Sequence, residues 1–261
     1  MTMLDEIVAA TRRRLPAVLD RQAGFESLAA DMPPASSFRN ALRSDGISVI
    51  AEVKRRSPSR GDLDPELNPV AQAVRYAAGG AAAVSVLTEP EYFSGSPDDL
   101  ATVAATLSVP VLRKDFIVHP AQIWEARGLG ASAVLLIVAA LGREELGGLL
   151  EVCRQAGVDA LVEVHDADEV AVALAAGAEI VGVNNRNLAD FTVDLATSEH
   201  LAPLLADVAV TVSESGISTA ADAARMRAAG FNAVLVGEAL VRSPDPAALV
   251  RELRGDGGGE W

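Results

Sequence analysis

A carboxylate and an amine stand two residues apart at the end of an apolar stretch near residue 50. Residues 47–53 predict a buried strand, and Glu52 and Lys54 lie at its carboxyl end. Because side chains alternate between the two faces of a strand, Glu52 and Lys54 leave the backbone on the same side. A buried charge is costly unless it is paired or used in chemistry. The pair is therefore either an ordinary ion pair or part of an active site.

Lysine is rare in this chain. Of the 22 basic residues, only Lys54 and Lys114 are lysines. Arginine keeps its proton at any useful pH, whereas lysine releases it when its surroundings lower its pKa. Both lysines stand where an apolar run meets a loop. We therefore expect proton transfer or Schiff-base chemistry at these two positions.

Other polar residues also follow apolar runs, and several share a strand face. Lys114 shares a face with Leu112, Glu163 with Leu161, and Asn184 with Gly182 and Arg186. If these faces point into one cavity, acids and amines lie close enough to separate their pKa values into acid and base roles. The candidates for catalysis are Glu52, Lys54, Lys114, Glu163, Asn184, Arg186 and Ser215.

These residues need a scaffold that gathers the ends of many strands, and the sequence supplies one. A short Val/Ile/Leu strand, a loop and an Ala-rich helix recur eight times, and the helices often end at Gly. The strands are predicted at 49–53, 82–87, 109–112, 133–137, 160–164, 180–183, 208–212 and 233–236. Eight such units in a chain of this size predict an α/β fold, a single (β/α)8 TIM barrel whose active site lies at the carboxyl ends of the strands. A doubly wound open sheet is the alternative, but the loop after the first strand lacks a Gly-rich phosphate fingerprint.

The two ends of the chain stand apart from the repeats. Residues 1–45 predict an N-terminal helical extension that lies over the body of the domain, with apolar residues at helical spacing such as Leu4 and Ile7. We expect one domain over residues 1–254 and a flexible tail over 255–261.

Charge and composition narrow the range of partners. The formal net charge of −14 disfavours nucleic acid or a membrane surface as a partner. Positive residues nevertheless gather in two loops, at 54–60 and 113–114, which suits an anionic metabolite. One cysteine and no signal peptide predict a cytoplasmic protein. Three scattered histidines and Cys153 show no metal-ligand spacing, so no metal site is expected.

The last two units carry a signal for phosphate. Loops after strands seven and eight of such barrels commonly bind phosphate through backbone N–H groups. Ser215-Gly216 and Gly237-Glu238 place glycine where a backbone must approach an anion. Together they favour a phosphate site.

Several motifs in order closely resemble the indole-3-glycerol-phosphate synthase family. They are Ile50-Ala51-Glu52-Val53-Lys54 with Ser57-Pro58-Ser59, Leu87-Thr88-Glu89 with Tyr92-Phe93, Val111-Leu112-Arg113-Lys114-Asp115-Phe116, Leu161-Val162-Glu163-Val164-His165, Gly182-Val183-Asn184-Asn185-Arg186-Asn187-Leu188, Glu214-Ser215-Gly216 and Leu235-Val236-Gly237-Glu238. The resemblance covers nearly the whole chain except its tail. Two departures, Arg56 before Ser57 and a bulky Asn185, are expected to affect loop mobility and not reaction type.

The resemblance implies a ring closure in tryptophan biosynthesis that needs no metal and no cofactor. The substrate would be 1-(2-carboxyphenylamino)-1-deoxyribulose 5-phosphate, which loses carbon dioxide and water. Lys114 would be the general acid and Glu163 the base. Lys54 would bind the aryl carboxylate and could also deliver a proton, so the resemblance leaves open which lysine serves which step. Glu52 would hold the lysines. Asn184 and Arg186 would orient hydroxyls. The substrate and phosphate contacts implied are Ser57, Phe93, Phe116, Leu135, Ile137, Leu188, Glu214, Gly216, Gly237 and Glu238.

Two other enzyme classes remain as alternatives, and both bind phosphate in a barrel. Phosphoribosylanthranilate isomerase fits less well because it uses a Cys where this chain has Lys54. A Schiff-base aldolase could use Lys54 or Lys114. In every case we expect an anionic phosphorylated small molecule as partner, no nucleic acid, no membrane, and a monomer or weak homo-oligomer.

Overall fold

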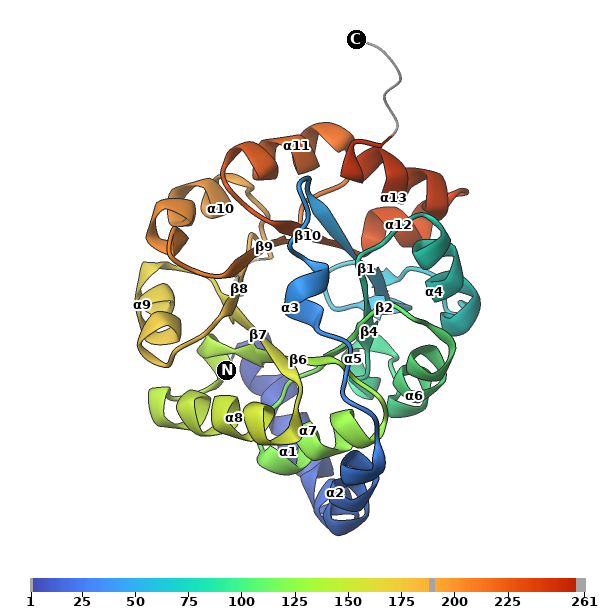
Figure 1. Cartoon of the computed structure of the whole chain (residues 1–261), viewed down its shortest axis with the longest axis vertical. Helices are drawn as coiled ribbons and strands as arrows, with labels where there is room; N and C mark the ends of the chain where they lie inside the picture. The colour runs from blue at the N-terminus through green and yellow to red at the C-terminus, as the bar shows by residue number, and fades with distance from the viewer. Residues whose placement is uncertain (1, 188–190, 257–261) are drawn as a thin grey trace.

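Each predicted strand is present in the computed structural model, which describes residues 2–187 and 191–256. The barrel strands are β1 (Ser48–Val53), β4 (Ala83–Leu87), β5 (Val111–Lys114), β6 (Ala133–Ile137), β7 (Asp159–Val164), β8 (Ile180–Asn184), β9 (Val210–Glu214) and β10 (Ala233–Val236). All neighbours pair in parallel, and the sheet closes in the order β1-β10-β9-β8-β7-β6-β5-β4 (Figure 1). The predicted (β/α)8 barrel is therefore confirmed.

Two strands begin two residues later than expected. The run at 109–112 contains Pro110, which has no N–H for the ladder, so β5 starts at Val111 and continues to Lys114. The run at 208–212 begins in a turn, because the Val208 N–H donates to the Leu205 carbonyl. In both cases the strand extends to the polar residue at its end.

Helices form a ring around the barrel, as Figure 1 shows. The outer helices are α4 (Pro69–Ala78), α6 (Pro97–Thr106), α7 (Pro120–Gly128), α8 (Arg143–Ala156), α9 (Ala167–Ala175), α10 (Ala196–Leu201), α11 (Ala220–Ala228) and α13 (Pro246–Arg254). Shorter elements lie in the loops: β2 (Arg56–Ser57), β3 (Gly61–Asp62), α5 (Pro90–Phe93), η1 (Val138–Ala140), η2 (Ala202–Leu205) and α12 (Glu238–Arg242). Gly157 ends α8 with φ of 70°, a conformation that favours glycine, as expected of a left-handed cap.

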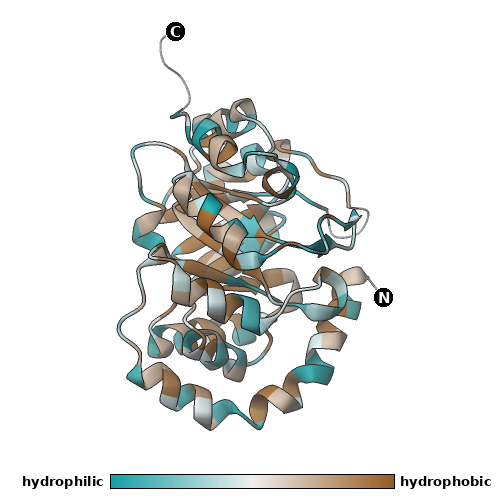
Figure 2. Cartoon of the chain, turned by 90° about the vertical axis from the view of Figure 1, so that its right-hand side faces the viewer, coloured by the Kyte–Doolittle hydropathy of each residue, from teal (hydrophilic) through white to brown (hydrophobic). Residues whose placement is uncertain are grey.

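The barrel wall separates two apolar clusters because side chains alternate along each strand. One cluster fills the barrel interior and includes Ile50, Leu112 and Leu161. The other lies between strands and helices and includes Val49 and Val162. Figure 2 shows the hydrophobic strands inside a more hydrophilic shell of helices. The faces that carry Leu112 and Leu161 therefore point into the barrel, and so do the polar residues that continue them.

The N-terminal extension runs from one end of the barrel to the other. It consists of α1 (Met3–Leu19), α2 (Gln22–Asp31) and α3 (Phe38–Ala41). The α2 helix packs against α7. Phe38 and Leu42, in and after α3, are fully buried and join the interior cluster. In Figure 1, α3 lies over the centre of the barrel, so it closes the amino-terminal end. No helix in the described ranges has the length and apolar character needed to span a membrane.

Candidate active site

One cavity of about 460 Å³ lies at the carboxyl ends of the strands. Every candidate residue in the described part of the chain lines it; Leu188 falls outside the described residues. The shared cavity brings together Glu52, Lys54, Ser57, Phe93, Lys114, Phe116, Leu135, Ile137, Glu163, Asn184, Arg186, Glu214, Ser215, Gly216, Gly237 and Glu238. Residues more than 180 positions apart in the sequence thus meet because parallel strands end on the same rim.

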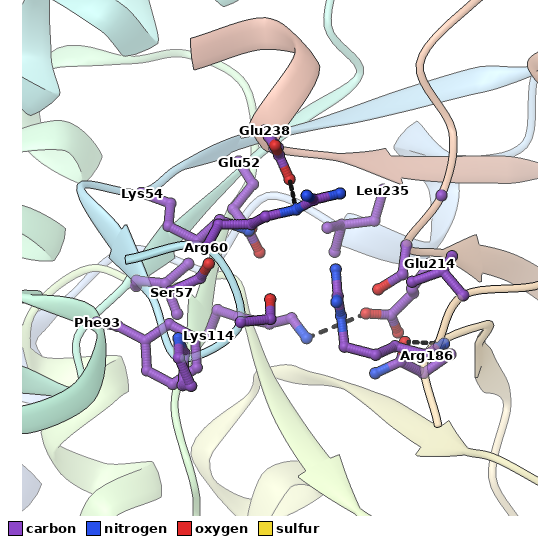
Figure 3. Close-up of a pocket in the computed structure, with 18 of the residues that line it drawn as sticks. Glu52, Lys54, Ser57, Arg60, Phe93, Lys114, Arg186, Glu214, Leu235 and Glu238 are labelled. Atoms are coloured by element: carbon purple, nitrogen blue, oxygen red, sulfur yellow. Dashed lines mark hydrogen bonds and ion pairs between the residues drawn. The ribbon is translucent and has the colours of Figure 1, made fainter. Parts of the chain in front are cut away.

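Lys114 lies between two carboxylates at the floor of this cavity. Its Nζ is 3.0 Å from Oε2 of Glu163 and 3.0 Å from Oε2 of Glu214. Figure 3 shows the Lys114 side chain extending toward these groups beside Arg186. Burial by itself lowers the pKa of Lys114, but Glu163, Glu214 and Glu52 outweigh burial and raise the pKa. Lys114 is therefore protonated at neutral pH.

The two carboxyl groups beside Lys114 differ in their pKa values. Burial would raise the pKa of Glu163, but Lys114 and His165 hold that pKa well below its usual range. Burial dominates for Glu214 and, with the charge of Glu163, raises its pKa to about 7. Neither Glu214 oxygen has an aligned hydrogen-bond partner among the described residues. Glu163 is thus an ionised carboxylate, whereas Glu214 exchanges its proton near neutral pH.

The second lysine forms a separate ion pair at the carboxyl end of β1. Lys54 Nζ lies 2.5 Å from Oε1 of Glu52, as the two-residue spacing predicts. A Cβ at Gly237 would come within 2.5 Å of Glu52 Oε1 and 3.0 Å of Lys54 Nζ. Gly237 therefore leaves the room that this ion pair occupies.

Asn184 and Arg186 continue the inward face of β8. Asn184 Nδ2 donates to Glu163 Oε1 at 3.2 Å, and the Arg186 N–H donates to Asn184 Oδ1 at 3.0 Å. Burial lowers the pKa of Arg186, although Glu238 opposes this effect. Asn184 therefore orients Glu163, while the guanidinium of Arg186 lies nearer the mouth of the cavity.

The cavity lining includes the residues for which the sequence predicts phosphate contact: Ser57, Ser215, Gly216, Gly237 and Glu238. Ser215 and Gly216 have φ values of 66° and 85°, which makes this turn the one place in the cavity where two successive described residues adopt the left-handed region. The Glu238 carboxylate contacts two arginines: its oxygens lie 3.5 Å from Arg60 Nε and 3.3 Å from Arg242 Nε. Figure 3 shows Arg60 reaching across to Glu238. The ion pairs of Glu238 therefore keep two guanidinium groups at the cavity.

Apolar side chains form the opposite wall. Phe93 and Phe116 pack with ring centroids 6.0 Å apart at an interplanar angle of 37°. Leu135 and Ile137 of β6 extend this wall. The wall and the polar floor together suit a flat ring that carries charged substituents.

Three cavity residues of α1 are among those that the sequence analysis missed. Met3, Leu4 and Ile7 of α1 also line the cavity. Salt bridges anchor this helix beside the site: Arg14 NH1 lies 3.0 Å from Glu89 Oε1, which belongs to the loop after β4. The helical spacing of Leu4 and Ile7 was visible in the sequence, but nothing local indicated that the helix reaches the active-site rim.

Several of the basic residues in the loops at 54–60 and 113–114 point away from the cavity. Arg113 is 3% exposed and pairs with Asp115 and Glu125 behind the barrel wall. Arg55 binds Asp99 of α6, and Arg56 faces solvent near Asp62. Side chains alternate along β5, so Arg113 and Lys114 cannot face the same cavity. Of the basic loop at 54–60, Lys54 and Arg60 line the cavity.

Asn185, one of the two departures noted in the sequence, has a structural explanation. Asn185 is 2% exposed, and its Nδ2 donates to Ser213 Oγ at 2.9 Å while its Oδ1 accepts from Ser198. It therefore joins β8 to β9 and α10 and lies outside the cavity.

Among the described residues, no group of three or more His, Cys, Asp or Glu could hold a metal ion. Cys153 is buried in α8, and burial raises the pKa of its thiol to about 12.

Comparison with known proteins gives independent evidence on the family of this chain. The family model described as indole-3-glycerol phosphate synthase matches residues 4–253. Indole-3-glycerol phosphate synthase 2 of Streptomyces coelicolor is 51% identical over 244 residues, which are 94% of this chain and 93% of that protein. The indole-3-glycerol phosphate synthase of Kineococcus radiotolerans is 49% identical and covers 97% of this chain.

Among solved structures, 3-hexulose-6-phosphate synthase aligns with a TM-score of 0.62 and 18% identity over 80% of this chain. At that identity the likeness shows the barrel fold alone. The family model and the relatives near 50% identity cover almost the whole sequence, so this chain belongs to the indole-3-glycerol phosphate synthase family.

Proposed function

We propose that the cavity closes the indole ring of 1-(2-carboxyphenylamino)-1-deoxyribulose 5-phosphate, with the residues in the roles below. As a member of its family, the chain is a decarboxylating lyase of tryptophan biosynthesis that acts on a phosphorylated small molecule. The observation that carries the assignment of roles is Lys114 Nζ at 3.0 Å from both Glu163 and Glu214 in the same cavity as the Lys54–Glu52 pair.

Lys114 acts first, as the general acid. The aryl carbon that bears the carboxylate attacks the ribulose carbonyl carbon, and Lys114 gives its proton to the carbonyl oxygen. The bond between that ring carbon and its carboxylate then breaks, carbon dioxide leaves, and the electron pair of the broken bond restores the aromatic ring. The former carbonyl oxygen, now a hydroxyl, takes a second proton from Lys54 and leaves as water, which completes the indole. Glu163 removes the proton that leaves in this dehydration, since its carboxylate is ionised and adjacent to Lys114.

The remaining groups bind and orient the substrate. Lys54 pairs with the aryl carboxylate, Glu52 holds Lys54 and stabilises positive charge on the anilino nitrogen, and Asn184 and Arg186 orient hydroxyl groups. Ser57, Ser215, Gly216 and Gly237 surround the phosphate, with Arg60 near them. Phe93, Phe116, Leu135 and Ile137 contact the ring. In this assignment Glu238 contributes through Arg60 and Arg242.

A Schiff-base aldolase is less compatible with this site. Imine formation requires a neutral amine, whereas the carboxylates around Lys114 raise its pKa and keep it charged. Borohydride with a keto substrate would trap an adduct on an aldolase, and the synthase assignment predicts none.

The activity is tested by fluorescence detection of indole formation from purified protein and the synthetic substrate. Product release with carbon dioxide in equal amount supports the proposal, and an intact substrate overturns it.

We further propose one unit over residues 1–254, a monomer or weak homo-oligomer, and a cytoplasmic location. Sizing in solution tests the oligomeric state.

A further inference from the structure

His165 lies beside the proposed base and has no role in the steps above. It follows β7 directly, two residues after Glu163, and its side chain is 12% exposed. Its Nε2 lies 3.4 Å from Glu163 Oε1, on the side of the carboxylate opposite the one that faces Lys114. This Nε2 is buried and has no aligned hydrogen-bond partner among the described residues.

The other face of the imidazole is firmly held. Nδ1 lies 3.0 Å from Glu169 Oε2, and the same oxygen accepts the His165 backbone N–H at 2.8 Å. Glu169 is fixed in turn, because its own N–H donates to Oδ1 of Asp166, the N-cap of α9. Glu169, His165 and Glu163 thus form a row of anion, imidazole and anion.

Among the described residues, the ion pairs and hydrogen bonds of the His165 ring are to carboxylates alone. Its own strand supplies Glu163, α9 supplies Glu169, and β8 supplies the neutral amide of Asn184. The η1 segment, packed against both β7 and α9, offers only Val138, Ala139 and Ala140. Burial by itself lowers the pKa of His165, but Glu163 and Glu169 raise it to about 10. The imidazole is therefore a cation at neutral pH.

This cation matters most when Lys114 has given up its proton. Up to that point Lys114 balances the charge of Glu163; once it is neutral, the Glu163 carboxylate would become more basic and free to turn. We propose that His165, held by Glu169, is a positioning residue that orients Glu163 through Oε1 and keeps it ionised during the step in which Lys114 is neutral. The inference rests on the proposed roles of Lys114 and Glu163.

The charge state of His165 can be measured without any assumption about the reaction. The chain has three histidines, so ¹⁵N-histidine labelling gives few signals, and His165→Gln assigns them. Both nitrogens of His165 should stay protonated to about pH 9 or above, and Glu169→Gln should lower the pH at which the proton is lost. Titration of His165 near its ordinary value of about 6.5 would overturn the proposal.

Kinetics tests the positioning role. His165→Ala should lower kcat roughly 10-fold to 100-fold, the range seen when an outer partner of a functional ligand is lost, with little change in KM. Glu169→Gln should retain activity near pH 7 but lose it at a lower alkaline pH than the wild-type protein. His200→Gln is the matched control, since His200 lies exposed on α10, and it should leave kcat unchanged.

A double variant separates this proposal from a general loss of structure. In a Glu163→Gln background, His165→Ala should cost nothing further, because His165 acts through Glu163. An equal loss of kcat in both backgrounds overturns the positioning role, as does a wild-type kcat in His165→Ala. Circular dichroism confirms folding of each variant. Failure of the proposed function would appear differently, as absence of product from the wild-type protein.

Discussion

Lys114 is surrounded by more negative charge than one amine can balance. Glu163 and Glu214 are each 3.0 Å from its Nζ, and Glu52 adds to the same field. Replacing Lys114 by Ala removes the proton donor, so we expect kcat to fall by about 10²–10⁴-fold while the fold persists. Indole fluorescence measures the loss and circular dichroism the fold. A near-normal rate in Lys114→Ala would contradict the assignment of the general acid.

Lys54 provides the complementary experiment. Its Nζ pairs with Glu52, and arginine can keep that pair and bind a carboxylate, but arginine does not release its proton. We expect Lys54→Arg to keep substrate binding and to lower kcat. Steady-state kinetics separates the two effects through KM and kcat. An unchanged kcat would mean that Lys54 supplies charge alone.

Glu214 makes the stability of the protein depend on pH. Its folded pKa, about 7, lies above the ordinary value of 4.5, so the folded protein binds more protons than the unfolded chain between these values. Stability associated with this group is present at low pH and is lost as pH rises toward and past 7. Glu214→Gln keeps the shape without the charge. We expect it to raise the free energy of unfolding at pH 8 by about 1–3 kcal/mol and to have little effect at pH 5.

Denaturant unfolding at the two pH values measures this difference. Glu151→Gln is a control, because Glu151 lies on the exposed face of α8 beside Arg154. An equal effect of Glu214→Gln at both pH values would show that its carboxyl is ionised throughout the range.

Strand β8 contributes Asn184 to the site, and its Gly182, which has no side chain, leaves space for the Glu214 carboxylate. A Cβ on Gly182 would meet Glu214 Oε1 at 2.2 Å and Leu161 Cδ1 at 3.2 Å. Gly182→Ala should therefore displace the Glu214 carboxylate from Lys114, lower kcat and cost about 1–3 kcal/mol of stability. Activity and thermal unfolding measure the two effects. Gly147→Ala in α8 is the matched control, because a Cβ there meets nothing within 4 Å. Comparable losses in both variants would rule out the steric explanation.

Much of the element pattern could be predicted, because each strand is an apolar run that ends in a polar residue and each helix follows a loop. The parity of β7 and β8 also predicted which side chains share the interior. The path of α1 could not be predicted, because the stripe that contains Leu4 and Ile7 fits any apolar surface. Parity was available but not applied to Arg113, which was grouped with Lys114 by charge although neighbours in a strand face opposite sides.

The partners of Glu238 were also beyond local sequence information. Arg60 lies 178 residues away in the chain, and their 3.5 Å contact exists only because β1 and β10 are neighbours in the closed barrel. Glu214 and Lys114 meet because β9 and β5 lie on opposite sides of the closed barrel and both side chains point into it. The pairing of charges in the cavity therefore depends on closure of the barrel. The sequence alone showed which charged residues are present, but not which of them form pairs.

The two ends of the barrel have different roles, one in catalysis and one in stability. The catalytic candidates lie at the carboxyl ends of the strands, whereas α3 closes the other end with Phe38 and Leu42. In such barrels the first end serves catalysis and the second stability. An aromatic residue at each end, Phe38 and Phe116, allows this division to be tested directly.

Phe38→Ala should lower the free energy of unfolding by about 3–5 kcal/mol, because Phe38 is fully buried in the barrel interior. Its kcat and KM should stay near wild-type at temperatures where the protein is folded, since Phe38 lies at the end of the barrel opposite the cavity. Phe116→Ala should do the reverse: it removes half of the Phe93–Phe116 pair, so KM should rise while stability falls less. Denaturant unfolding and steady-state kinetics on both variants decide the matter. Loss of turnover in folded Phe38→Ala would show that the two ends are coupled through the interior layers of side chains.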